Sequence, residues 1–409
     1  MSNYGQKAQD CLSELSMFSE TTQGVTRRPF TSEHRSTINY LTSLMQDAGL
    51  QVYCDDSGTL IGRYQSRQSN KTLVFGSHQD SIRKGGRYDG IMGIVLPILA
   101  LKSLARDNID LPFSVEIMAF ADEEGVRFPT ALMGPRVLAG TFDIENLTLS
   151  DADGISLQDA MQQFGLNPEN LPALKRSADD LIGFLEVHIE QGPVLESHNL
   201  ALGVVSAICG IERHEIEFVG ESAHAGTCPM ELRKDALVAA AQLICEAEKY
   251  AKKRKDLKIT VGRLNVEPNV VNAIPSHASF SLEIRSPNDK IRLESGEYLH
   301  KQCENLASAR HLQVSMKKTY EQIAQPCNDD FQRKWQSAIR SLGLPEFSLP
   351  SGATHDASAM ADLTPIGMLF VRSQRGLSHN PAEYTLSEDM DLAIQAIKSL
   401  LKNWQDKSA

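Results

Sequence analysis

The sequence contains no pair of cysteines in a C-x-x-C spacing, and its seven cysteines are scattered along the chain. This pattern excludes a disulfide framework and a zinc-ribbon motif. The first residues, Met1 to Lys7, lack the charged and then apolar pattern of a signal peptide. No apolar run approaches the roughly 20 residues that span a bilayer. We therefore expect a cytoplasmic protein with no membrane partner.

A basic face is also lacking, because the formal net charge is −11. Nucleic-acid binding needs clustered positive charge, so we expect no nucleic-acid partner. A small anionic substrate would have to be held by a few local cations, since the overall field repels it. The length of 409 residues exceeds one ordinary core and predicts two domains.

Strands that alternate with helices predict an α/β fold, with a mixed sheet covered by helices. A different pattern interrupts it, with strands expected at 212–219, 257–266, 278–285 and 312–317 and helices at 233–253 and 291–309. This β-α-β-β-α-β order is typical of a ferredoxin-like unit. We therefore expect a split catalytic domain, residues 1–207 and 322–409, around an inserted domain, residues 208–321.

Four apolar strands each lead into a motif that carries histidine or carboxylate side chains. The motifs are Gly76-Ser77-His78-Gln79-Asp80 with Tyr88-Asp89-Gly90, Asp122-Glu123-Glu124-Gly125, Val187-His188-Ile189-Glu190-Gln191-Gly192, and Ser378-His379-Asn380-Pro381. In open α/β sheets, ligands bind at the carboxyl ends of the strands. The four motifs together therefore predict one metal-centred active site.

The adjacent pair Glu123 and Glu124 is the most informative of these motifs. Two buried carboxylates repel each other, so burial raises one pKa unless a cation is present. Neighbouring side chains diverge on extended backbone, so one can bind metal while the other faces water as a base. A solvated acidic loop is the alternative, but the apolar run 113–121 leads directly into the pair.

His188 shares one face of its strand with Glu186 and Glu190, because strand side chains alternate. A lone histidine there would more often be structural, yet this polar stripe favours a site. His379 is followed by Pro381, which prevents a strand from continuing. Histidines and carboxylates together suit zinc, manganese, cobalt or nickel.

These motifs, together with His224-Ala225-Gly226-Thr227, resemble the hydantoinase/carbamoylase branch of the M20 metallopeptidase family. The resemblance implies an amidohydrolase that cleaves the ureido C–N bond of an N-carbamoyl-L-amino acid or an allantoate-type substrate, releasing ammonia and CO2. M20 peptidases usually have Asp or Glu at the position of His188, so the histidine favours a ureido amidase. An M20 aminoacylase or dipeptidase, and a catalytically silent metal-binding scaffold, are the alternatives.

The resemblance also implies two divalent metal ions, with Asp89 shared between them. The implied ligands are His78, Asp89 and His188 for one ion, and Asp89, Glu124 and His379 for the other. Glu123 matches the general base of the family. Asp80 matches the residue that orients the ring of His78.

Substrate contacts follow from the same resemblance, and the matching residues are Gln191, His224, Asn272, Arg285, Gly352 and Thr354. Arg285 would pair with a substrate carboxylate, and His224 would stabilise the oxyanion. In the family this histidine reaches the site of the other subunit, which implies a homodimer through the inserted domain. That domain would also close over the substrate as a lid.

Three positions depart from the family pattern. Thr354 stands where glycine is usual before His355, and its side chain could narrow the substrate range. Pro135 replaces a common serine, and Glu283 replaces a common aspartate near Arg285.

Overall fold

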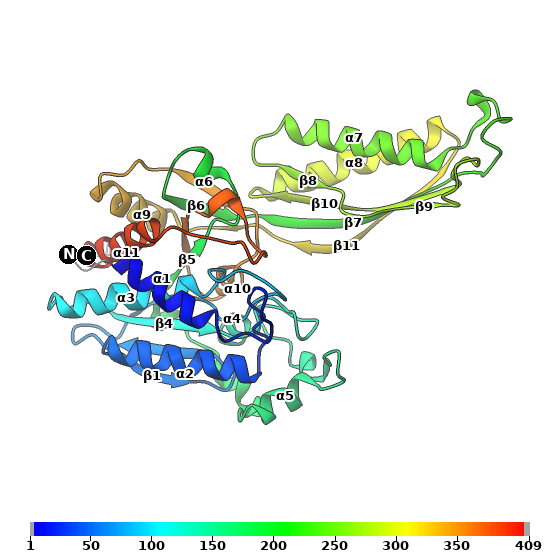
Figure 1. The fold of residues 1–409 in the computed structure, drawn as a ribbon. Coiled ribbons are helices and arrows are strands. Elements are labelled where there is room, and N and C mark those ends of the chain that lie inside the picture. Colours follow the sequence, from blue (N-terminus) through cyan, green and yellow to red (C-terminus); the bar gives the residue numbers. More distant parts are fainter. Residues whose placement is uncertain (1–3, 405–409) are drawn as a thin grey trace. The chain divides into compact units, whose positions relative to one another are not determined.

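The structure, a computed structural model, describes residues 4–404, which divide into two compact units. Unit 1 contains residues 4–206, 327–349 and 353–404, and unit 2 contains residues 207–326 and 350–352. Each unit has its own helices and strands (Figure 1). Within residues 4–404, no helix is long and apolar enough to cross a bilayer.

The large sheet mixes parallel and antiparallel strands. Its strands are β1 (Gln51–Cys54), β2 (Leu60–Tyr64), β3 (Thr72–His78), β4 (Ser114–Phe120), β5 (Leu181–Ile189), β6 (Leu202–Ile208), β12 (Gln325–Pro326), β13 (Ser348–Ser351) and β14 (Ile366–Val371). The order is β1-β2-β4-β3-β5-β14-β6-β12, with β13 also paired to β6. The four central strands β4, β3, β5 and β14 are parallel, and β2 and β6 flank them antiparallel. The predicted α/β class with a mixed sheet is confirmed.

Helices lie on both faces of this sheet. They are α1 (Tyr4–Leu15), α2 (Ser32–Asp47), α3 (Met92–Arg106), α4 (Met133–Ala139), α5 (Leu157–Gln163), α6 (Val194–Ser197), α9 (Asp329–Ser341), α10 (Asp356–Met360) and α11 (Ser387–Lys402). One apolar core joins α1, α2, α3, α9 and α11 to the sheet. Helices α4 and α10 contact each other and the central strands outside that core.

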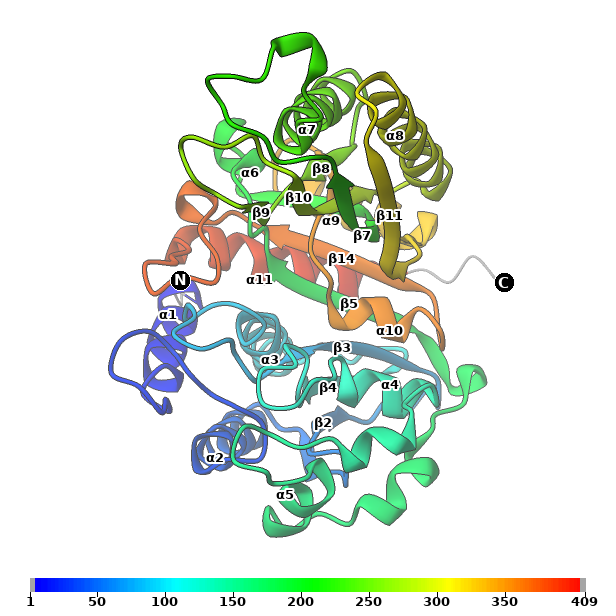
Figure 2. The same ribbon diagram turned by 90° about the vertical axis from the view of Figure 1, so that its right-hand side faces the viewer.

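Alternation along the central strands decides which side chains reach each face. Phe75, Val187 and Leu369 point into the core beneath α3 and α11. His78 and His188 have the opposite parity and therefore lie on the face of α10. Helix α10 lies against β3, β5 and β14, as Figure 2 shows.

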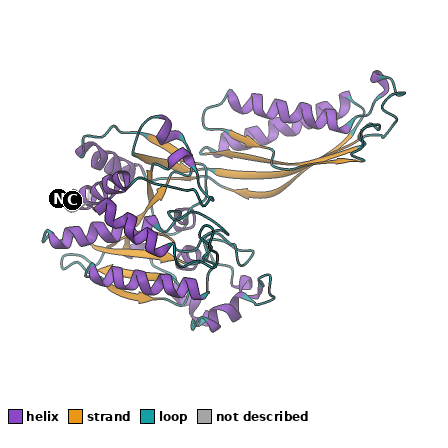
Figure 3. Ribbon diagram, viewed as in Figure 1, coloured by secondary structure: helices purple, strands orange, loops and turns teal. Residues whose placement is uncertain are grey.

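Unit 2 is a five-stranded antiparallel sheet with two helices. Its elements are β7 (Gly210–Val219), α7 (Ala236–Lys252), β8 (Lys258–Thr260), β9 (Leu264–Glu267), β10 (His277–Ser286), α8 (Asp289–Ala309) and β11 (Gln313–Gln322). The strand order is β11-β7-β10-β8, with β9 also paired to β10. Both helices lie on one face of the sheet (Figure 3) and share an apolar core with it. This is the β-α-β-β-α-β arrangement, with one strand broken in two.

The prediction of one continuous strand over residues 257–266 is wrong. Both β8 and β9 pair with β10, and the break between them contains Gly262 and Arg263. The hydroxyl of Ser281 accepts the N–H of Arg263 at 3.1 Å, and the Ser281 N–H donates to the Arg263 carbonyl at 3.1 Å. A glycine inside a strand favours such an irregularity, because it has no side chain to pack.

Candidate metal centre

The carboxyl ends of the four parallel strands bring the predicted ligands together. His78 is the last residue of β3, and His188 is the penultimate residue of β5. Glu123 and Glu124 follow β4, and His379 lies in the loop after β14. Figure 2 shows these four strands side by side in unit 1.

Asp89 lies at the centre of this cluster. Its Oδ1 is 3.6 Å from Nε2 of His78 and 3.2 Å from Nε2 of His188. Its Oδ2 is 3.2 Å from Nε2 of His379, which is itself 3.6 Å from Oε1 of Glu124. The two oxygens of one carboxylate therefore face two different sets of donors.

Four groups of three residues have ligand atoms within 4.8 Å of one another. They are His78, Asp89 and His188; Asp89, Glu124 and His379; His78, Glu123 and Glu124; and Glu186, His188 and His355. The first two groups share Asp89 and contain the five predicted metal ligands. The third places Glu123 beside a ligand of each group.

Hydrogen bonds hold two of the histidines with Nε2 toward Asp89. Nδ1 of His78 bonds the carbonyl of Asp80 at 3.0 Å, and Nδ1 of His188 bonds the carbonyl of Ile189 at 2.9 Å. A carbonyl partner keeps the proton on Nδ1 and leaves Nε2 unprotonated, which is the form that binds a metal. Nε2 of His188 also accepts the N–H of Gly90 at 3.2 Å.

Asp80 has a second role besides the contact with His78. Its carboxylate lies 3.8 Å from Nδ1 of His78, farther than its own carbonyl. Its Oδ1 accepts the N–H of Glu123 and its Oδ2 the N–H of Glu124, each at 3.1 Å. The main chain of Asp80 therefore bonds the histidine ring, while its side chain anchors the acidic pair.

Surplus negative charge shifts the titration of the centre. Burial raises the pKa of Glu123 well above its ordinary value, and repulsion from Glu124 adds to it although His78 opposes it. Burial and the Asp89 carboxylate raise the pKa of Glu124 to about 7. Burial opposes ionisation of Asp89, yet hydrogen bonds with His188, His379 and His78 hold its pKa well below the usual range.

The residues fit divalent metal ions. Seven carboxyl groups of the centre and its surroundings are almost fully buried: Asp80, Asp89, Asp122, Glu123, Glu186, Asp356 and Glu383. Both carboxyl oxygens of Asp122 and of Asp356 lack a hydrogen-bond partner in the described part of the chain. Buried carboxylates in such excess must be protonated or balanced by cations. Imidazole and carboxylate are ligands that zinc, manganese, cobalt and nickel accept.

Local backbone strain accompanies three residues of these loops. Asp122, Gln191 and His379 have φ of 55°, 56° and 55°, a left-handed conformation that residues other than glycine seldom adopt. Such strain persists where the surrounding structure fixes it, and it is frequent at functional sites.

The predicted substrate residues are divided between the units. In unit 1, Nε2 of Gln191 donates to Oδ2 of Asp89 at 3.1 Å, and Thr354 is half-buried just before α10. In unit 2, His224 and Asn272 are exposed in loops bridged between His224 and Ala273.

Arg285 of unit 2 already has two partners. Its Nε donates to Glu283 at 2.6 Å, and its Nη1 donates to the carbonyl of Gly352 at 2.5 Å. Glu283 also accepts from Nε of Arg213 at 2.6 Å. Glu283 therefore links two arginines.

Sequence reasoning did not assign three buried residues near the ligands. Glu186 accepts from Ser77 Oγ at 2.8 Å and from the Ala357 N–H at 2.9 Å, and its place in the polar stripe of β5 was a signal for it. The ring centroid of His355 lies 4.6 Å from that of His188. Glu383 bonds the Asp89 loop from a distant part of the chain, and no local pattern indicates it.

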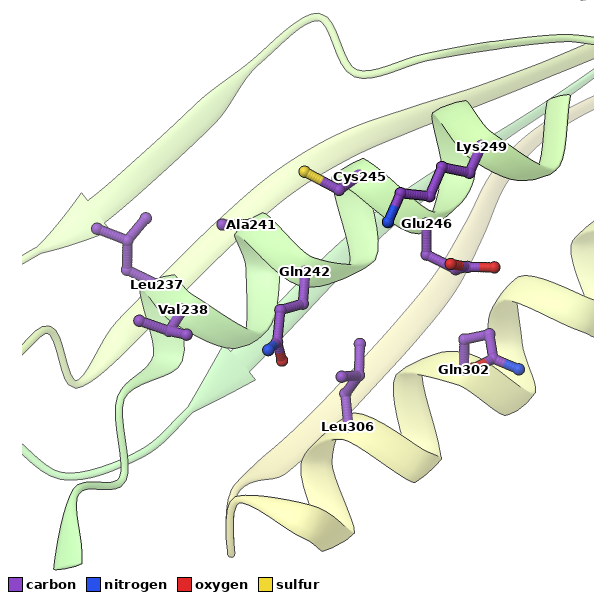
Figure 4. Close-up of a pocket in the computed structure, with 9 residues that line it drawn as sticks. All are labelled: Leu237, Val238, Ala241, Gln242, Cys245, Glu246, Lys249, Gln302 and Leu306. Carbon is purple, nitrogen blue, oxygen red and sulfur yellow. The ribbon is translucent and has the colours of Figure 1, made fainter. Parts of the chain in front are cut away.

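A separate groove of about 490 Å³ lies in unit 2 between α7 and α8 (Figure 4). It is lined by Leu237, Val238, Ala241, Gln242, Cys245, Glu246, Lys249, Gln302 and Leu306. None of the predicted metal or substrate residues lines it.

Comparison with known proteins agrees with the geometry of the centre. The profile of peptidase family M20/M25/M40 matches residues 74–403. The chain belongs to this family. An N-carbamoyl-L-amino acid amidohydrolase of Geobacillus stearothermophilus is 38% identical over 375 residues, covering 91% of this chain and 92% of that protein. An allantoate deiminase of Arabidopsis thaliana is 35% identical, covering 96% of this chain and 81% of that protein.

Solved structures show the same similarity. A hydantoinase/carbamoylase family amidase of Burkholderia multivorans superposes with a TM-score of 0.91 at 28% identity, covering 97% of both chains. The likeness therefore extends over both units of this M20/M25/M40 family member.

Proposed function

We propose that the protein is a dinuclear-metal amidohydrolase that cleaves the ureido C–N bond of an N-carbamoyl-L-amino acid or an allantoate-type substrate. The observation that carries this proposal is the position of Asp89, whose two oxygens face separate donor sets beside Glu123. The names of the related amidohydrolase and deiminase support the choice of substrate class.

Two divalent ions, zinc, manganese, cobalt or nickel, are proposed for the site. His78, Asp89 and His188 would hold one, and Asp89, Glu124 and His379 the other. When bound, the metal pair would polarise the ureido carbonyl and make water a stronger nucleophile near neutral pH.

Glu123 is proposed to move the proton in this reaction. Its raised pKa means that its carboxylate readily takes a proton from the attacking water molecule. As the water oxygen bonds to the ureido carbon, Glu123 takes the water proton and delivers it to the departing nitrogen. The C–N bond breaks to give a free amine and a carbamate, and the carbamate decomposes by breaking its own C–N bond, so that the final products are ammonia, CO2 and the amine-bearing acid.

Asp80 and Gln191 orient groups for this chemistry. The carboxylate of Asp80 anchors the backbone of Glu123, so the side chain of the base keeps a fixed starting point. Gln191 and Ser378 each donate to Oδ2 of Asp89 at 3.1 Å and fix that carboxylate.

Arg285 is proposed to bind the substrate carboxylate. It supplies the local cation that an acidic protein needs for an anionic ligand. His224, Asn272, Gly352 and Thr354 are proposed as further substrate contacts, with His224 also stabilising the oxyanion.

A homodimer formed through unit 2 is proposed as well. The groove between α7 and α8 has the apolar side chains of Leu237, Val238 and Leu306 in its lining, and Val238 is 38% exposed. His224 lies in an exposed loop, as a residue that reaches a second subunit must. Sedimentation analysis of wild type and Val238→Glu tests this, because a charge in the groove should yield monomers.

Ammonia release tests the activity itself. Metal-depleted protein is supplied in turn with zinc, manganese, cobalt or nickel and offered N-carbamoyl-L-amino acids, allantoate, carbamoyl-β-alanine, N-acyl amino acids and dipeptides. Ammonia from the first three classes, lost on metal removal, is the expected result. Hydrolysis of acyl or peptide substrates alone would indicate an aminoacylase or dipeptidase, and no hydrolysis with any of the four metals a silent scaffold.

A further inference from the structure

Glu383 occupies a buried position behind Asp89. Its side chain is 2% exposed, and its Oε1 accepts the N–H of Tyr88 at 2.8 Å and the N–H of Asp89 at 3.1 Å. One carboxylate oxygen therefore fixes the backbone on both sides of the Tyr88–Asp89 peptide. Two such bonds determine the direction in which the Asp89 side chain leaves the chain.

The same residue belongs to the loop that carries His379. The N–H of Glu383 donates to the carbonyl of Asn380 at 3.0 Å, which closes a turn directly after His379. Glu383 thus connects the loop of His379 to the loop of Asp89, two segments almost 300 positions apart in sequence. The side chains of the same two loops also approach each other, because Nε2 of His379 lies 3.2 Å from Oδ2 of Asp89.

The surroundings leave Glu383 little freedom. A Cβ atom on Gly86 would lie 2.1 Å from Cδ of Glu383, so this glycine lets the backbone approach the carboxyl group closely. Tyr88, whose N–H donates to Glu383, is fully buried. Its ring packs edge-to-face with that of Tyr384, with the ring centroids 5.9 Å apart. The side chain is therefore held by packing as well as by its hydrogen bonds.

We infer that Glu383 is a positioning residue that holds Asp89 and His379 at the separation needed to bind the second metal ion. The inference rests on the proposed function in one respect, that Asp89, Glu124 and His379 bind a metal. The ligands His78 and His188 lie on β3 and β5, which Glu383 does not contact through these bonds. Because Asp89 is shared but only the second set contains His379, loss of Glu383 should weaken the second ion more than the first.

Metal titration of metal-depleted protein with Mn²⁺ tests this inference, with the thermal midpoint recorded for each variant. Glu383→Ala and Glu383→Asp should bind the second ion about 10- to 100-fold more weakly, the usual cost of losing a residue that hydrogen-bonds behind a ligand, and the first ion with a smaller loss. The aspartate keeps the charge but is one methylene too short. Glu383→Gln should retain most of the affinity, because its amide oxygen can accept the same two N–H groups.

Asp55 offers a matched control. It is 9% exposed, and its Oδ1 accepts the N–H groups of Ser57 at 2.9 Å and Thr59 at 3.2 Å in the turn between β1 and β2. Asp55→Ala should lower the thermal midpoint and leave both metal affinities unchanged. A purely structural role for Glu383 would give the same result as this control.

Two results would overturn the inference: wild-type affinity for both ions in Glu383→Asp, or equal weakening of both ions. Fewer than two metals in the wild type would overturn both this inference and the dinuclear proposal. Two metals without ureido hydrolysis would overturn the proposed function alone.

Discussion

Oδ1 of Asp80 accepts the backbone N–H of Glu123 at 3.1 Å. The two residues lie just after the ends of neighbouring parallel strands, β3 and β4, so the sheet brings them close together. The bond anchors the main chain of Glu123 and leaves its carboxyl group beside His78 and Glu124. We make two predictions for the acidic pair, Glu123 and Glu124.

The first concerns the base. Glu123→Gln should bind both metals with nearly unchanged affinity, because Glu123 belongs to neither proposed ligand set. Its turnover of a ureido substrate should fall by about 10²–10⁴-fold, the usual contribution of a general base. Metal content and kcat measured on the same sample check this, with the exposed Glu196→Gln as control. Undiminished kcat would remove Glu123 from the proposed role.

The second concerns protons released by metal binding. Burial and Asp89 raise the pKa of Glu124 to about 7 in the metal-free protein, whereas a bound metal requires the ionised carboxylate. As pH falls through 7, protons compete more strongly with the metal for the Glu124 carboxylate. The metal affinity of the protein should therefore drop, and more protons should be released for each metal ion that binds. Calorimetric titration at pH 6.5 and 8, in buffers of different ionisation enthalpy, measures both. Equal proton release at the two pH values contradicts the expectation.

The central strands could be predicted because each combines an apolar run with a polar motif at its end. Candidate ligands such as His78 and Glu124 could be proposed for the same reason, since each lies in a short motif of polar residues directly after an apolar strand. Strand β6 and helix α4 were missed because their stability comes from packing against segments distant in sequence. The break between β8 and β9 was missed because Gly262 alone does not distinguish a weak strand from an interrupted one.

Glu383 shows the limit of sequence reasoning at the site itself. Its partners, Tyr88 and Asp89, are far away in the chain, and its own neighbourhood contains no recognisable motif beyond Pro381. The role of the Asp80 carboxylate was hidden in a similar way, because only the fold brings it beneath Glu123 and Glu124. Candidate ligand residues were therefore easier to recognise in the sequence than the residues whose side chains hydrogen-bond the backbone around them.

Stability in acid should depend on His34. This histidine is 1% exposed, and its Nδ1 accepts the N–H of Phe30 at 2.9 Å, so the neutral ring is the bound form. Burial and the nearby Arg27 and Arg35 lower its pKa from 6.5 to about 3. Between these values the unfolded chain binds a proton that the folded protein does not. Folding stability from this group is therefore complete above pH 6.5 and is lost as pH falls toward 3, by at most about 1.4 kcal/mol per pH unit.

His34→Gln isolates this contribution, because the amide oxygen can accept the Phe30 N–H without titrating. Urea unfolding of both proteins between pH 7.5 and 4.5 should show a steeper loss for wild type below pH 6.5. Parallel curves would show that His34 is protonated in the folded state.

Substrate charge should be recognised by Arg285. Its guanidinium uses Nε for Glu283 and Nη1 for the Gly352 carbonyl, so these bonds orient the group in advance. Arg285→Ala should raise KM for an anionic ureido substrate by about 10- to 100-fold, equivalent to roughly 1.4–2.7 kcal/mol, and change kcat less.

Arg263→Ala is the matched control, because Arg263 pairs with Glu215 on the surface of the same unit. The comparison uses each substrate and its uncharged amide: the Arg285 variant should lose the preference for the acid, whereas the Arg263 variant should keep it. An unchanged KM for the acid in Arg285→Ala would mean that another residue binds the carboxylate.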